Sequence, residues 1–218
     1  MKKLTHVNRF LPLLLCLLAA QTRVAAQSLK DFFANSSTPA LYLGLDYTKA
    51  KVIDDISATP PDIKERYYPG INDLILTEPK KYDLNAVFHR SNIEHDLGPV
   101  TARNEKINAD DIRSTSSSDY HRLKAEDING VVSAYNFGTH KGIGILFVVE
   151  AMSKTDKGAA IWVTFVDMSS KKVLMTERLE GKTSMGFGFR NYWAIPVHNV
   201  MEEIEKKKYK EWSAKYGS

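Results

Sequence analysis

Three successive segments in the last third of the chain are rich in apolar residues and predict neighbouring β-strands. They are residues 143–152, 160–168 and 172–180, joined by short polar stretches whose lengths suit hairpins. The first two are apolar on both alternating faces, whereas the third carries exposed charges. Because a strand buried on both faces belongs inside a sheet, the pattern predicts a three-stranded antiparallel meander that runs from the sheet centre to a charged edge.

The first half of the chain contains fewer regular patterns. Residues 40–47 predict a strand, residues 86–89 a second short strand, and residues 90–121 a long polar excursion over the surface. The alternating positions of the first strand divide into two faces, Leu41, Leu43 and Leu45 on one and Tyr42, Gly44 and Asp46 on the other.

Apolar residues at helical spacing predict three helices. One includes Ile71, Leu74 and Ile75 and should end before Pro79, and another carries the stripe Ile128, Val131, Val132 and Tyr135. Residues 196–212 predict a final helix with Pro196 near its start. The order of elements predicts an α+β fold over residues 40–218: a single-domain mixed sheet that includes the meander, with helices packed on it and the C-terminal helix last.

The first 26 residues have the composition of a secretory signal peptide. Three basic residues precede an apolar run over residues 10–20, which is well short of the roughly 20 residues that span a bilayer. Small residues before Gln27 predict cleavage between Ala26 and Gln27, and therefore a periplasmic or secreted protein without a transmembrane helix in its mature form. Residues 27–39 predict a tether that places Phe32 and Phe33 against the body of the protein.

Cys16, the single cysteine, leaves one alternative to cleavage at Ala26. A lipoprotein would be cut before this cysteine and lipidated on it, but leucines surround Cys16 where such sites have small residues. We therefore expect a mature chain without cysteine, which excludes disulfides and thiolate chemistry.

The positive net charge of the chain comes entirely from its first 26 residues. The whole chain has 30 Lys and Arg against 26 Asp and Glu, a net charge of +4, and the first 26 residues hold four of the bases and no acid. The remainder is balanced overall. Because nucleic-acid binding needs an excess or a patch of basic residues, we expect no nucleic-acid partner.

Few residues form a pattern typical of catalysis or metal binding. Residues 181–184 (GKTS) lack the earlier glycine of a phosphate-binding loop, and the histidines are spaced unlike metal ligands. We therefore predict no cofactor, no metal and no enzymatic activity. The alternative is a hydrolase or glycan-binding enzyme that uses carboxylates such as Asp46, Glu150 or Asp167, although Glu150 and Asp167 would lie at opposite ends of their strand ladder.

The segment of residues 186–193 (GFGFRNYW) combines four aromatic residues with an arginine. Aromatic residues and arginine are favoured in binding sites for proteins and sugars, which makes this segment the candidate interaction site. Its residues are Phe187, Phe189, Arg190, Tyr192 and Trp193. In the alternative interpretation these aromatics pack between the sheet and the last helix, and Arg190 pairs with a carboxylate.

Residues 159–194 contain the pattern V-T-F-x-D-x-x-x-K-x-V-L followed by G-F-G-F-R-N-Y-W. This run resembles a family of uncharacterised exported proteins of Gram-negative bacteria. The order of elements also resembles the small α/β domain of the Tol-system propeller protein, the curli-secretion lipoprotein and the activators of peptidoglycan synthases. In that domain a turn here matched by residues 166–174 precedes the last helix, although residues 169–171 (SSK) replace the usual Thr-Gly.

The resemblance implies a non-enzymatic module of the cell envelope. Together with the export signal, it predicts an interaction or scaffolding protein whose partner is another envelope protein or a glycan. The pattern leaves the oligomeric state open.

Overall fold

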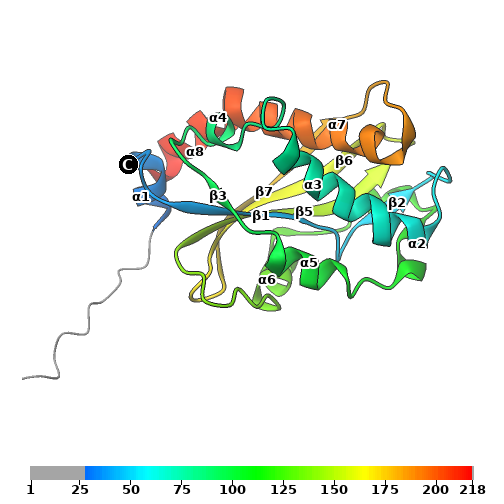
Figure 1. Ribbon diagram of the computed structural model, residues 1–218, viewed down its shortest axis with the longest axis horizontal. Coiled ribbons are helices and arrows are strands. Elements are labelled where there is room, and N and C mark those ends of the chain that lie inside the picture. The colour runs from blue at the N-terminus through cyan, green and yellow to red at the C-terminus, as the bar shows by residue number, and fades with distance from the viewer. Residues whose placement is uncertain (1–27, 218) are drawn as a thin grey trace, which may run out of the picture.

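Residues 28–217 of the computed structural model are described, and they form a seven-stranded sheet with helices on both faces (Figure 1). The predicted signal peptide and its cleavage site lie outside the described residues. The strands are β1 (Ala40–Asp46), β2 (Lys51–Ile53), β3 (Glu94–His95), β4 (Arg113–Ser114), β5 (Ile143–Ser153), β6 (Gly158–Asp167) and β7 (Lys172–Lys182). The α+β class predicted from the sequence is confirmed.

The helices lie in two layers, one on each face of the sheet. The α-helices are α1 (Leu29–Ala34), α2 (Pro60–Asp62), α3 (Tyr68–Thr77), α4 (Leu84–Val87), α5 (Gly98–Asn104), α6 (Ala125–Ser133), α7 (Gly188–Glu203) and α8 (Tyr209–Tyr216). Other helical turns are η1 (Ile63–Tyr67), η2 (Ala109–Asp111), η3 (Ser117–His121) and η4 (Ile204–Lys208). Helices α3, α4, α7 and α8 cover one face, and α5 and α6 cover the other (Figure 1).

Strand β5 is the spine of the sheet. One of its edges pairs in parallel with β1 and then with β2, so that β1 and β2 form one strand interrupted at residues 47–50. The short strands β3 and β4 continue the sheet in parallel beyond β1 and β2. On its other edge β5 pairs antiparallel with β6, which pairs antiparallel with β7. The parallel half of this sheet was not described by the sequence patterns.

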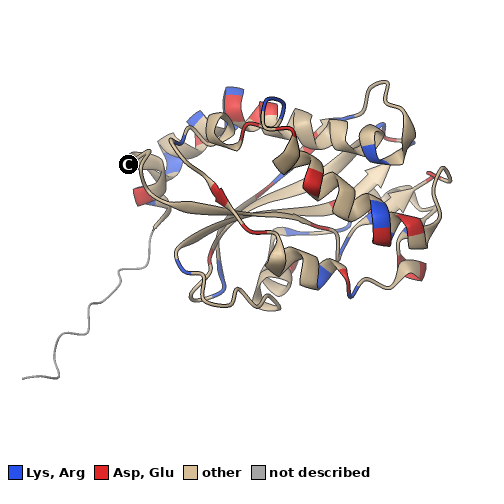
Figure 2. Ribbon diagram, in the orientation of Figure 1, with Lys and Arg blue, Asp and Glu red and all other residues tan. Residues whose placement is uncertain are grey.

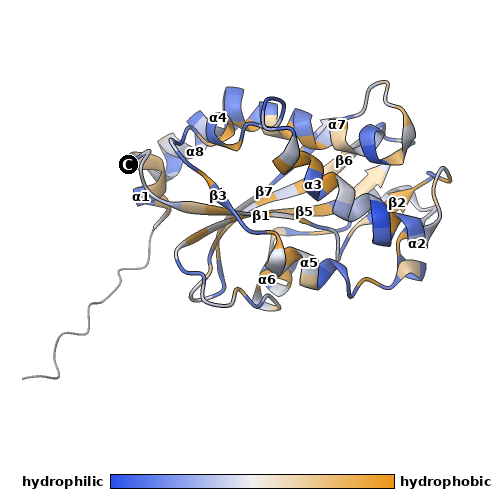
Figure 3. Cartoon of the chain, in the orientation of Figure 1, coloured by the Kyte–Doolittle hydropathy of each residue, from blue (hydrophilic) through white to orange (hydrophobic). Residues whose placement is uncertain are grey.

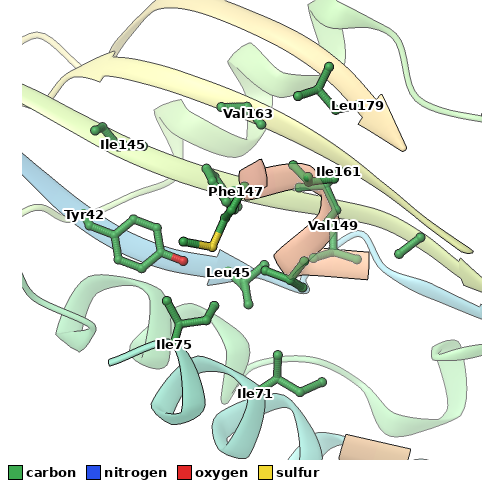
Figure 4. Packing of buried hydrophobic residues seen from close by; sticks show 14 of the residues in the cluster. Tyr42, Leu45, Ile71, Ile75, Ile145, Phe147, Val149, Ile161, Val163 and Leu179 are labelled. Carbon is green, nitrogen blue, oxygen red and sulfur yellow. The ribbon is translucent and has the colours of Figure 1, made fainter. Parts of the chain in front are cut away.

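Alternate residues of β5 supply two separate cores. Ile145, Phe147 and Val149 pack with α3 and α7, as Figure 4 shows for part of this cluster. Leu146 and Val148 pack on the opposite face with α5 and α6. Strands β1, β5 and β6 are largely apolar in Figure 3, and Figure 2 shows most of the charged residues on helices and loops. Burial on both faces explains why this strand lacks any polar alternation.

The predicted faces of β1 are wrong beyond Leu43. The register against β5 shifts between Tyr42 and Gly44, and Gly44 adopts a left-handed φ of 100°. A Cβ at Gly44 would lie 2.7 Å from a Leu97 methyl, so that only glycine fits this bulge. After the bulge Leu45 joins the same core as Tyr42, and Asp46 turns to the α5 and α6 face.

Two other local predictions are also wrong. Residues 86–89, expected as a strand, form the end of α4 and the turn after it, because Asp83 caps the helix by accepting a hydrogen bond from the Ala86 amide. The expected excursion over residues 90–121 contains β3, α5 and β4. These strands have two residues each, too few to create a periodic pattern.

The residues expected as a tether include a docked helix. Ser28 and Asp31 form a capping box at the start of α1, and Phe32 and Phe33 are buried in the larger core. The two aromatic rings pack edge to face with centroids 5.1 Å apart, and both contact Phe165 of β6. The start of the described chain is therefore anchored to the sheet.

The final helix begins eight residues earlier than predicted, so Pro196 lies inside α7. An internal proline costs a helix about 3 kcal/mol. Phe189 and Trp193, one turn apart on the added segment, are both buried and supply the packing that offsets this cost. The carbonyl of Pro196 approaches Gly181 of β7 so closely that a Cβ there would lie 1.9 Å from its oxygen.

Two glycine substitutions test this packing. Gly181→Ala should lower the free energy of unfolding by about 1–3 kcal/mol, because the new methyl group overlaps the α7 backbone. Gly130→Ala is the matched control, since nothing lies within 4 Å of its Cβ position on α6. Alanine should raise stability there by about 0.5–1 kcal/mol. Urea unfolding of both variants measures the difference, and equal effects would contradict the packing of α7 on β7.

Candidate functional site

The residues of the predicted interaction segment lie at the start of α7, where some are buried and others are exposed. Phe187 is the N-cap residue of the helix and Gly188 its first residue. Phe189 and Trp193 point into the larger core and are 3% and 0% exposed, whereas Phe187 is 95% exposed. The segment is therefore partly core and partly surface.

Trp193 links α7 to the loop after β2. Its indole Nε1 donates a 2.8 Å hydrogen bond to the carboxylate of Asp55, which is itself buried. Phe189 packs on Tyr67 of η1 with the ring centroids 5.0 Å apart. These two aromatics fix the helix end in the core and are not available to a partner.

Arg190 and Tyr192 lie outside the core. The Arg190 Nε donates to the side chain of its neighbour Asn191 at 3.2 Å, and within the described residues no carboxylate pairs with it. Tyr192 is half-buried: its hydroxyl is 2.9 Å from Thr183 Oγ1, and the ammonium of Lys154 lies 3.4 Å from its ring centre. Through these two contacts, Tyr192 links the loop of residues 183–187 to Lys154.

This loop carries two of the most exposed apolar side chains in the described chain. Met185 is 98% and Phe187 95% exposed, and Ile56 on the loop after β2 is 84% exposed. We name these three residues the apolar tip. Both loops lie at the same end of the sheet, on the right in Figure 1.

Hydrogen bonds connect the loops that carry the apolar tip. The amide of Thr183 donates to the carbonyl of Lys157 in the β5–β6 turn at 2.8 Å. In the same turn, Thr155 donates from its hydroxyl to Asp54 at 2.6 Å. The amide of Lys154 donates to the carbonyl of Ile53 at 3.0 Å. The β5–β6 turn therefore joins both loops and holds the apolar tip in place.

A hollow of about 540 Å³ lies against the loop of residues 183–187. Met185, Phe187 and Tyr192 supply its apolar lining, and the charged residues that line it are Lys154 and Lys157. The acids on the neighbouring loops, Asp54, Asp55 and Asp156, each accept a hydrogen bond from a nearby side chain, and Asp55 also lies 3.9 Å from the Lys154 ammonium.

The three carboxylates of the alternative enzymatic hypothesis are each bound inside the fold. Glu150 lies in a bulge of β5, is fully buried, and accepts hydrogen bonds from the Leu123 amide, Trp162 and Arg178. Asp167 accepts hydrogen bonds from Ser169 and Ser170 in the β6–β7 turn. Asp46 is fully buried against Arg103.

Among the described residues, no group of three or more potential metal ligands gathers as a metal site would require. In the same part of the chain, none of the helices has the length and apolar character needed to cross a bilayer.

Ile56 and Met185 were not predicted from the sequence. A single apolar residue in a polar loop has no periodicity, and its exposure depends on how the loop folds. Within residues 186–193, Phe187 is exposed, whereas Phe189 and Trp193 are buried, a division that the aromatic density of the segment does not predict.

Comparison with known proteins adds little to this site. No family model matches the chain, and no curated protein matches it. A solved structure of a neuraminyllactose-binding hemagglutinin homolog from Helicobacter pylori is 11% identical, covering 87% of this chain and 95% of that chain, with a TM-score of 0.28. A likeness this weak carries no argument about fold or ligand.

Substitution of Trp193 and Phe187 tests the division between core and surface. Trp193→Ala should lower the free energy of unfolding by about 3–5 kcal/mol, because it leaves a cavity and removes the indole hydrogen bond to buried Asp55. Phe187→Ser should change it by less than about 0.5 kcal/mol, since the ring contacts mainly solvent. Chemical unfolding of the two variants is the measurement. A large loss for Phe187→Ser would place that ring in the core instead.

Proposed function

We propose that the protein is a non-enzymatic interaction module of the bacterial cell envelope, and that the apolar tip binds a partner protein. The observation that carries the proposal is the near-complete exposure of Met185 and Phe187 on one loop, with Ile56 exposed on a second loop that the β5–β6 turn joins to the first. Single exposed apolar residues are ordinary on a protein surface, but two large ones that line the same hollow are typical of a contact site.

The connected loops also favour binding. Ordering a flexible loop on association costs free energy, and loops already joined by hydrogen bonds avoid much of that cost. Phenylalanine and methionine are enriched in the buried centres of interfaces. Lys157 beside the tip favours a partner that presents an apolar pocket with an acidic group at its edge, whereas the Lys154 ammonium already lies 3.9 Å from the Asp55 carboxylate.

Export of the chain is part of this proposal, as the signal-like composition of residues 1–26 indicates. The enzymatic alternative has no comparable support in the structure. Asp46, Glu150 and Asp167 each accept hydrogen bonds from within the fold, which leaves them poorly placed to act on a substrate.

Photo-crosslinking in intact cells of the native host tests the contact. A photoreactive phenylalanine analogue at position 187 should give a discrete adduct with a partner protein, because the side chain projects from the loop. The same analogue at position 210, an exposed site on α8, is the control and should give none.

A second pair of variants links the adduct to the apolar tip. In a variant that also carries both Ile56→Ser and Met185→Ser, the yield of the adduct at position 187 should fall about tenfold, since each substitution removes apolar contact area. Adding Lys80→Ser and Lys210→Ser should leave it unchanged. Absence of an adduct at position 187, or equal adducts at 187 and 210, would refute the proposed surface.

A further inference from the structure

A second concave site, with no residue in common with the apolar tip, lies where β1 is interrupted. This cleft has a volume of about 510 Å³ and is bounded by the loop of residues 47–50 and by residues around α5 and η2. Five basic side chains line it, namely Lys49, Lys51, Arg103, Lys106 and Arg122, together with one acid, Asp111.

Where the chain leaves the sheet after β1, hydrogen bonds from side chains take the place of the backbone hydrogen bonds of the β-ladder. The Tyr47 amide donates to Asn104 Oδ1 at 2.9 Å, and the Thr48 amide donates to Asp46 Oδ1 at 2.7 Å. Asn72 bonds both the amide and the carbonyl of Leu45. The loop that forms one wall of the cleft is therefore held by specific contacts.

Buried Asp46 also positions a basic wall of the cleft. Arg103 Nε lies 3.2 Å from Asp46 Oδ2, and the hydroxyl of Tyr135 donates to the same oxygen at 2.6 Å. The Arg103 guanidinium stacks over the Tyr135 ring at 4.7 Å. Burial raises the pKa of Tyr135 well above its ordinary value, and the Asp46 charge raises it further, so this hydroxyl remains a donor.

Two of the remaining bases, Lys51 and Arg122, are held by neutral groups. Lys51 donates to the backbone carbonyl of Asp111, and Arg122 donates to the backbone carbonyl of Lys49. Neither contact cancels positive charge. Among the described residues, Arg103 alone of the five cleft bases forms an ion pair with a carboxylate.

The acids around the cleft do not balance these bases. Asp111 accepts a hydrogen bond from Asn108 at 3.1 Å. An adjoining hollow shares Lys49, Arg103 and Arg122 with the cleft and is bounded on its far side by Glu126 and Asp127, of which Asp127 caps α6. Like charges gathered in a concave site create a strong local potential that attracts anions.

We infer that this cleft binds a small phosphate-bearing ligand. Arginine presents paired donors that match the oxygens of phosphate, and lysine adds mobile positive charge. The Arg122 guanidinium lines the cleft and, among the described residues, forms no ion pair, so its positive charge is available to an anion. The volume is that of a small-molecule site, which favours a compact ligand over a polymer.

Calorimetric titration of the protein with pyrophosphate tests this site. Binding should be detectable at low ionic strength and weaken as salt is added, because the attraction is electrostatic. The double variant Lys49→Glu with Lys106→Glu should weaken binding by about tenfold or more. Both lysines are exposed, and circular dichroism verifies that the variant is folded.

A control variant with the same net charge as the cleft variant distinguishes an effect of the cleft from an effect of the overall charge of the chain. Lys80→Glu with Lys210→Glu, both outside the cleft, should reduce affinity less than about threefold. Vesicles containing phosphatidylglycerol form a parallel arm that distinguishes a lipid phosphate from a soluble one. The site is supported if the cleft variant, and not the control variant, loses binding to pyrophosphate or to the vesicles. Binding of neither probe, or equal loss in both variants, would overturn it, and neither outcome bears on the apolar tip.

Discussion

The left-handed backbone at Gly44 is the constraint on which the two sides of this fold depend. Without the bulge, strict alternation would place Asp46 beside Tyr42, facing the helices α3 and α7. With it, Leu45 fills the larger core and Asp46 points to the opposite face, where it meets Arg103 and Tyr135. One glycine thus allows β1 to supply apolar packing to one layer and a buried carboxylate to the other.

The interruption that follows this bulge produces the cleft. Strand β5 continues through the region as one strand, while the neighbouring chain leaves the sheet at residues 47–50 and returns as β2. Asparagine side chains complete the missing backbone hydrogen bonds, so the detour remains ordered. The apolar tip does not depend on this interruption. It depends on contacts among loops at the ends of β2, β5 and β7. The proposed protein contact and the proposed phosphate site are therefore structurally independent.

The elements that could be predicted from the sequence are those with long apolar patterns. Strands β5 and β6 and helix α6 have enough apolar positions to identify them without tertiary information. The faces of β1 could not be predicted, because a bulge depends on the neighbours that exclude a side chain at Gly44. Nor could the cleft, because its bases lie between positions 49 and 122 and converge only after folding. The balanced overall charge of residues 27–218 conceals such a local excess.

Amide hydrogen exchange at Thr48 tests the role of Asp46 most directly. This amide lies in the detour between β1 and β2, and its acceptor is the Asp46 carboxylate at 2.7 Å. The structure predicts slow exchange in the wild-type protein, and fast exchange in Asp46→Ala while the Phe147 amide of β5 stays protected. Fast exchange of the Thr48 amide in the wild-type protein would contradict the claim that Asp46 holds the interrupted strand.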